Sequence, residues 1–127
     1  RGVAKDDARA AQLYQAAADQ GNASAQYNLG LLHEFGRCVA KDDARAAQLY
    51  QAAANQGNAH AQCNLGFMYR FGRGVAKDDA RAAQLYQAAA GQGSAIAQCN
   101  LGCMYGYSCS AVASVYTALL SPRRAPP

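Results

Sequence analysis

The sequence contains no tryptophan and only one isoleucine, five valines and three prolines among its 127 residues. Because β-branched residues favour strands, their scarcity disfavours a fold rich in β-structure. The abundant residues are alanine, glutamine, leucine and arginine, which favour helices. The composition therefore predicts an all-α protein.

Long apolar runs are also missing. A membrane-crossing helix needs roughly 20 consecutive apolar residues. The longest candidate lies around residues 111–120 and contains Ser114 and Thr117. The sequence therefore predicts no membrane span in this chain.

Alanine supplies most of the apolar content. Apolar residues make up 51% of the chain, yet the mean hydropathy is slightly negative, at -0.24, because 31 of these residues are alanines. The net charge is only +4, so the low content of large aliphatic residues does not indicate a disordered chain.

The strongest feature of the sequence is an internal repeat. The segment 2–37 returns at 38–73 and again at 74–109, without gaps, which gives a period of 36 residues. A period of this length indicates a stack of supersecondary units, none of which buries its apolar face alone. The repeat defines three units with the bounds 2–37, 38–73 and 74–109.

Each unit is predicted to contain two helices. In the first, Leu13, Tyr14 and Ala17 share one face by their helical spacing. Acidic residues at the helix start, such as Asp6, cap free amide groups and meet the positive end of the helix dipole. Gly21 then ends the first helix in a left-handed conformation, and the next residue caps the second helix.

The second helix carries a glycine in its middle in all three copies: Gly30, Gly66 and Gly102. A glycine there costs about 1 kcal/mol relative to alanine. Its recurrence predicts that two backbones approach too closely for a side chain, with the alanine-rich first helix as the partner.

The pattern A-x-L-Y-x-A-A-x-Q-G-N-A-x-A-Q-x-N-L-G resembles the Sel-one-like repeat (SLR) family, a relative of the tetratricopeptide repeat. The resemblance covers residues 1 to about 107. It implies an α-solenoid, a right-handed superhelix of stacked antiparallel helix pairs, whose first helices line a concave groove. One departure is Cys38, which replaces a loop glycine; if that position needs a positive φ, Cys38 carries a small strain.

The two ends of the chain depart from the repeat. Residues 1–3 match the end of a repeat loop, so the sequence is interpreted as a fragment that starts within the repeating pattern. Residues 110–121 are predicted either to form a short C-terminal capping helix or to have no selected structure. Residues 122–127 are predicted to be a disordered tail.

The five cysteines invite a disulfide or zinc interpretation. Cys63 and Cys99 occupy the same repeat position, so they should lie on neighbouring helices roughly 8 to 10 Å apart, too far for a disulfide. A zinc site with His60 is conceivable, but no C-x-x-C pair occurs. We therefore predict buried free thiols, no metal site and no cofactor, a pattern that favours a reducing compartment.

Two other functions remain as alternatives. Some cysteine-rich proteins that resemble this pattern are known as weak β-lactamases, but no serine here has a lysine three places on, as serine β-lactamases require. Lysines and arginines recur in each repeat, which suggests binding to nucleic acid. An aspartate pair lies beside each of these basic sets, however, and would neutralise its positive charge. We therefore predict neither an enzyme nor a nucleic-acid-binding protein.

The prediction from sequence is a scaffold that binds a partner protein or peptide through the groove that the resemblance implies. A polar stripe on the first helices would face this groove and hydrogen-bond to the partner; alternatively, it is only solvated helix surface. The stripe consists of Arg9, Gln12, Gln15, Arg45, Gln48, Gln51, Arg81, Gln84 and Gln87.

Overall fold

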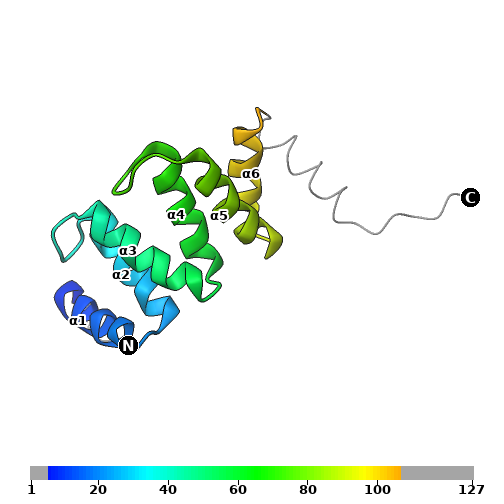
Figure 1. The fold of residues 1–127 in the computed structure, drawn as a ribbon. Helices are drawn as coiled ribbons and strands as arrows, with labels where there is room; N and C mark the ends of the chain where they lie inside the picture. The colour runs from blue at the N-terminus through cyan, green and yellow to red at the C-terminus, as the bar shows by residue number, and fades with distance from the viewer. Residues whose placement is uncertain (1–5, 107–127) are drawn as a thin grey trace, which may run out of the picture.

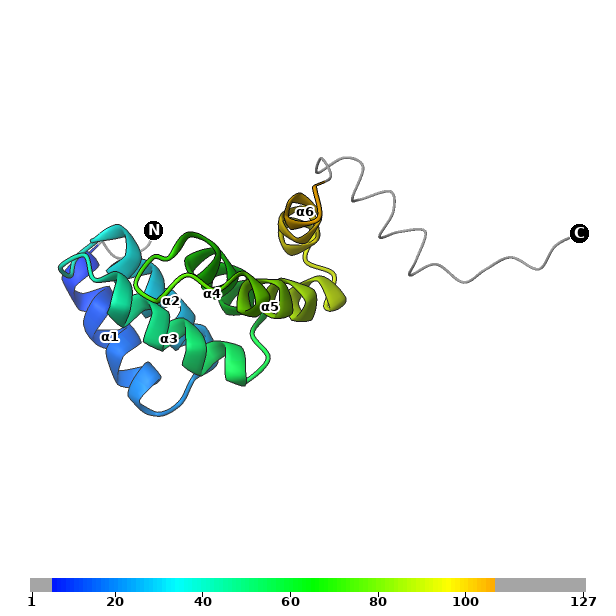
Figure 2. The same ribbon diagram turned by 45° about the horizontal axis from the view of Figure 1, so that its top comes forward.

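The computed structural model describes residues 6–106, which form six helices and no strand. The helices follow one another along an extended array, and each packs against the next (Figures 1 and 2). This arrangement confirms the all-α solenoid of repeating helix pairs. The expected capping helix at 110–121 and the tail at 122–127 lie outside the described residues. The helices are α1 (Asp7–Asp19), α2 (Ala23–Phe35), α3 (Asp43–Asn55), α4 (Ala59–Phe71), α5 (Asp79–Gly91) and α6 (Ala95–Met104).

The helix starts are capped as the sequence predicts. The side chain of Asp6 accepts a hydrogen bond from the backbone amide of Arg9 at 3.1 Å, and Asp42 and Asp78 do the same in the next repeats. The second helices are capped by Asn22, Asn58 and Ser94. Each cap satisfies an amide group that has no partner within the helix.

The loop that joins consecutive repeats requires a left-handed residue. Gly74 has φ 71°, and a Cβ atom there would collide with the backbone carbonyl of Asp43. Cys38, one repeat earlier, has φ 66°. The predicted strain at Cys38 is thus confirmed, and a left-handed non-glycine residue costs about 1–2 kcal/mol.

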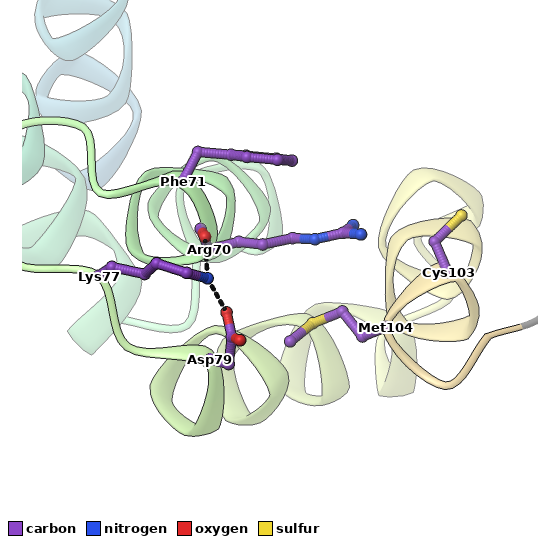
Figure 3. Close-up of a pocket in the computed structure, with 6 residues that line it drawn as sticks. All are labelled: Arg70, Phe71, Lys77, Asp79, Cys103 and Met104. Carbon is purple, nitrogen blue, oxygen red and sulfur yellow. Dashed lines mark hydrogen bonds and ion pairs between the residues drawn. The ribbon is translucent and has the colours of Figure 1, made fainter.

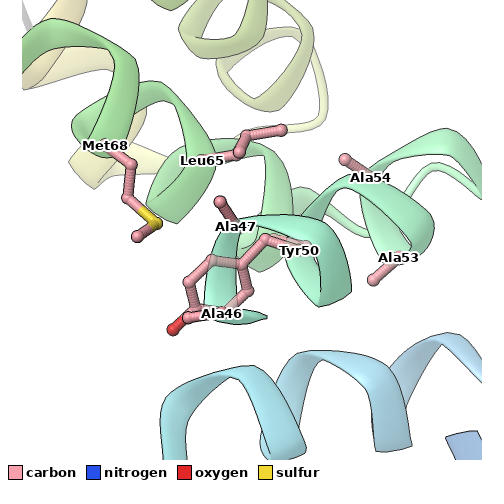
Figure 4. Packing of buried hydrophobic residues seen from close by; sticks show 8 residues of the cluster. Ala46, Ala47, Tyr50, Ala53, Ala54, Leu65 and Met68 are labelled. Atoms are coloured by element: carbon pink, nitrogen blue, oxygen red, sulfur yellow. The ribbon is translucent and has the colours of Figure 1, made fainter. Parts of the chain in front are cut away.

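The core is built around α3, which is enclosed by α2 and α4. Ala46, Tyr50 and Ala53 of α3 are fully buried and cluster with Leu65 and Met68 of α4 (Figure 4). The small alanine side chains let the helices approach closely, so the tyrosine ring and two long side chains fill the remaining space.

The recurring glycine packs against an alanine-rich first helix, as expected, but it meets a side chain of that helix rather than its backbone. A Cβ atom on Gly30 would lie 2.6 Å from Cε1 of the Tyr50 ring, and one on Gly66 would lie 2.9 Å from Cε1 of Tyr86. The prediction of backbone-to-backbone contact was therefore wrong. The glycine makes room for an aromatic ring from the first helix of the next repeat, because ring atoms occupy the space that a methyl group would need.

Glutamines join neighbouring repeats at the other end of the helices. The Nε2 atom of Gln56 donates to Oε1 of Gln26 at 2.9 Å, and Nε2 of Gln26 donates to the carbonyl of Ala18 at 3.4 Å. One repeat later, Nε2 of Gln92 donates to Oε1 of Gln62, also at 2.9 Å. These bonds fix the turn between the helices of one repeat to the end of the following first helix.

Candidate functional site

The polar stripe lies on the first helices α1, α3 and α5, and most of its side chains are exposed. Gln15 and Gln51 are half-buried, whereas the other seven side chains are exposed. The exposed members are Arg9, Gln12, Arg45, Gln48, Arg81, Gln84 and Gln87.

Two residues of the stripe line a cavity of about 400 Å³ between α3, α4 and the loop after α4. Gln48 and Gln51 form its polar part, and the rest of its lining is mostly small or apolar. The other lining residues are Ala44, Ala47, Leu65, Tyr69, Gly74 and Val75. An apolar hollow with a few oriented polar groups is the usual form of a ligand or peptide site.

Arg81 reaches this site from α5. Its Nη2 atom donates to Oε1 of Gln51 at 3.1 Å, and its guanidinium lies 5.6 Å from the centre of the Tyr69 ring. The Nε2 atom of Gln51 donates to Asn55 at 2.8 Å, so both ends of this amide are held. The structure thus brings Gln48, Gln51 and Arg81 together around one hollow.

The remaining stripe residues are distributed along the array. Gln15 donates to Asp19 at 2.8 Å, as Gln51 does to Asn55. Sequence reasoning did not include Tyr69, Leu65 and Val75 in the site. An aromatic residue or a histidine recurs at the repeat position of Tyr69, as His33, Tyr69 and Tyr105. This pattern marks the position but does not place it beside the stripe, because the two lie on different helices.

A partly buried ionic network joins the first two repeats. The Tyr50 hydroxyl donates to Oε1 of Glu34 at 2.6 Å, and Oε2 of Glu34 pairs with Arg73 at 3.6 Å. Arg73 also pairs with Asp43 at 3.5 Å. Burial and the bond to Glu34 raise the pKa of Tyr50, whereas the hydrogen bond from Lys41 lowers the pKa of Asp43. No local pattern in the sequence indicates this network, because its members come from separate helices and a loop.

The cysteines within residues 6–106 form no disulfide. Cys63 is buried, which raises its pKa, whereas Cys38 is exposed in its loop. Cys99 and Cys103 are half-buried. The interpretation as buried thiols at helix interfaces thus fits Cys63, fits Cys99 and Cys103 in part, and does not fit Cys38. The part of the chain that the structure describes contains no group of three or more histidine, cysteine or acidic residues arranged to hold a metal ion.

No helix in residues 6–106 combines the length and apolar character needed to cross a membrane.

Comparison with known proteins identifies one family. The model of the Sel1 repeat matches residues 1–22, 23–58, 59–94 and 95–109. The matched units begin where α2, α4 and α6 begin, so they divide the 36-residue period at a different point from the units read from the sequence. A search of curated proteins finds no match.

Solved structures with the same arrangement include three bacterial proteins. The protective antigen c5321 of uropathogenic Escherichia coli, which displays an SLR fold, is 38% identical with a TM-score of 0.76; the match covers 79% of this chain and 21% of that protein. A Sel1 repeat protein from Oxalobacter formigenes is 38% identical with a TM-score of 0.78, over 82% of this chain and 43% of that protein. Helicobacter pylori cysteine rich protein B is 27% identical with a TM-score of 0.70, over 73% of this chain and 70% of that protein. The chain thus spans less than half the length of the first two.

Proposed function

Because this chain belongs to the Sel1 repeat family, we propose that it is an interaction scaffold that binds a partner protein or peptide along the polar stripe of α1, α3 and α5. Members of this family generally act as protein-interaction scaffolds rather than as catalysts.

The observation that carries this proposal is the hollow beside Gln48, Gln51 and Arg81. Its apolar lining offers a place for a side chain of the partner, and the amide of Gln48 is available to hydrogen-bond to the partner's backbone. Because Arg81 and Asn55 hold the Gln51 amide in place, binding here costs less side-chain entropy than binding to a free glutamine.

Local charge pairing supports a protein partner over nucleic acid. Lys41 lies 2.7 Å from Asp43, and Lys77 lies 2.7 Å from Asp79. A run of phosphates is bound by cations that are free to replace counterions. The positive charges of Lys41 and Lys77 are already paired with aspartates, so they offer little attraction for phosphates.

The test is co-precipitation of partners from an extract of the source cell with wild type and with the double variant Gln48→Glu, Gln51→Glu. The added carboxylates would repel carbonyl groups of the partner's backbone, and the substitutions remove two amide donors. We therefore expect recovery of the specific partner to fall by about tenfold or more.

The matched control is the double variant Gln20→Glu, Ser24→Glu, which adds the same charge at exposed positions outside the hollow. Recovery by this control should equal that of wild type. If both double variants retain the partner equally, the assignment of the binding surface to the stripe is wrong.

A further inference from the structure

Arg81 is held in place beside the hollow of Gln48 and Gln51. Its guanidinium donates to Oε1 of Gln51 at 3.1 Å and lies 5.6 Å from the centre of the Tyr69 ring, and both of these residues line the hollow. A guanidinium carries several N–H donors in a planar fork. Within residues 6–106 the bond to Gln51 is the one hydrogen bond that the Arg81 side chain donates. Its other donors are therefore available to a ligand that lies in the hollow.

The acidic residues near Arg81 are engaged with other groups. Asp78 caps α5 by accepting the backbone amide of Arg81 at 3.0 Å, and Asp79 pairs with Lys77 at 2.7 Å. Asp43, at the start of α3, pairs with a lysine at 2.7 Å and with an arginine at 3.5 Å. No ion pair joins the Arg81 guanidinium to any residue of the described range 6–106. Arg81 is therefore a fixed cation that still lacks an anionic partner there.

The arginine of the preceding repeat is not fixed in this way. Arg45 occupies the repeat position of Arg81, and His33 occupies that of Tyr69. The backbone amide of Arg45 donates to Asp42, but its side chain makes no hydrogen bond, ion pair or ring contact within residues 6–106. An ion pair with a side chain that is already fixed costs less conformational entropy, so Arg81 suits an anionic ligand better than Arg45 does.

A second cavity lacks this combination of features. It has a volume of about 420 Å³ and lies between the end of α4, the start of α5 and α6 (Figure 3). The Asp79 carboxylate stands in its wall and pairs there with Lys77. A fixed negative charge in the wall opposes an acidic ligand. No acidic residue of the described range lines the hollow beside Gln48, so that hollow is the one that suits an acidic ligand.

We propose that the hollow beside Gln48 binds an apolar side chain of an extended acidic peptide, and that a neighbouring carboxylate of this peptide pairs with Arg81. This inference rests on the function proposed above, because it names the chemistry of the partner that the stripe binds. Leu65 and Val75 offer apolar surface to an aliphatic side chain. A carboxylate matches the planar guanidinium in geometry and can accept two of its N–H groups.

The test is a titration of wild type, followed by two-dimensional NMR, with a short acetylated and amidated peptide that has leucine at its centre and a glutamate on either side. A matched neutral peptide carries glutamines in place of the glutamates. We expect saturable shifts of the Gln48 and Gln51 side-chain amides with both peptides, because both offer the same leucine to the hollow. The acidic peptide should bind about fivefold more tightly, as expected for one ion pair near the surface. Added salt should reduce this preference.

The variant Arg81→Gln should abolish the preference, so that the acidic and neutral peptides bind about equally. Loss of the bond to Gln51 affects both peptides alike and therefore cancels in the ratio of their affinities. Arg45→Gln should lower the preference by less than about twofold, because that side chain is not fixed beside the hollow. The control Arg37→Gln makes the same substitution at an exposed arginine outside the stripe and the hollow, and it should keep the full preference.

Equal affinities of the two peptides for wild type would overturn the inference, as would equal losses of preference in Arg81→Gln and Arg45→Gln. Both results leave the proposed function in place, because the neutral peptide still occupies the hollow. The absence of saturable shifts with either peptide would also overturn the inference. Co-precipitation of a partner that the Gln48, Gln51 double variant loses would then show that the scaffold function stands without it.

Discussion

At the scale of single residues, the repeat provides internal comparisons. Tyr50 and Tyr86 occupy the same position of consecutive first helices, and both are fully buried. Tyr50 donates to Glu34, whereas the Tyr86 hydroxyl meets no acceptor within residues 6–106. The same side chain therefore contributes to stability at one interface and carries an unpaired polar atom at the other.

This difference predicts opposite outcomes for one substitution. Tyr50→Phe should lower the free energy of unfolding by about 1.5–3 kcal/mol, because a buried hydrogen bond to a charged acceptor is lost. Tyr86→Phe should change it by less than about 0.5 kcal/mol or raise it. Urea unfolding of both variants measures the two values, and equal losses would contradict the network.

The Tyr86 hydroxyl also predicts a pH dependence. Its pKa is about 12 in the folded protein and about 10 in an unfolded chain, so the folded state holds this proton more tightly. The stability linked to Tyr86 is fully present below pH 10 and is lost as the pH rises toward 12. Thermal unfolding across this range should show a falling Tm, with a smaller fall in Tyr86→Phe. An equal fall in both proteins would show that Tyr86 is not the group responsible.

At the scale of elements, the sequence predicted the helices and their caps but not the contacts that set their spacing. Acidic and asparagine caps act locally, so they are readable from short segments such as 6–9 and 22–25. The recurring glycine correctly indicated close packing. Its partner, the Tyr50 ring, lies 20 residues further along the chain, and no local pattern connects them.

At the candidate site too, local patterns could be predicted from the sequence, whereas contacts between distant residues could not. The stripe could be predicted because helical spacing places its members on one face. The hollow beside Gln48 could not, because it is formed by Leu65, Tyr69 and Val75 from another helix and a loop. The exchange of Glu34 for Arg70 was visible in the repeat alignment, but its consequence appears only once Tyr86 is placed beside it.

The glycine contact predicts a further difference between two matched substitutions. Gly30→Ala should destabilise the protein by about 1–3 kcal/mol, because the new methyl group overlaps the buried Tyr50 ring. Gly91→Ala, at the end of α5 with no neighbouring atom within 4 Å of the new Cβ, should stabilise it by about 0.5–1 kcal/mol. Chemical denaturation distinguishes the two; a stabilising Gly30→Ala would refute the ring contact.

At the scale of the whole molecule, nearly identical helices occupy different environments. Leu13 of α1 is 63% exposed, whereas Leu49 at the same position of α3 is 7% exposed. The helices α1 and α3 differ only in their last residue. Stability in such an array depends on contacts between neighbours, so position in the stack decides how firmly a given helix is held.

Amide hydrogen exchange tests this directly. We expect the amides of α3 to exchange more slowly than those of α1, since α3 is covered by α2 on one side and α4 on the other. Because the two sequences are nearly the same, intrinsic exchange rates cancel in the comparison. Equal protection of α1 and α3 would indicate that the array unfolds as one cooperative unit.

Binding of a partner protein or peptide along the polar stripe can be measured at single positions of the stripe. The experiment is photo-crosslinking in an extract of the source cell, with a photoreactive residue placed in turn at Gln48, Gln84 and Ser24. We expect that Gln48 and Gln84 capture the same partner, while Ser24, which lies on α2 outside the stripe, does not. Capture of that partner from Ser24 alone, or equally from all three positions, would contradict it.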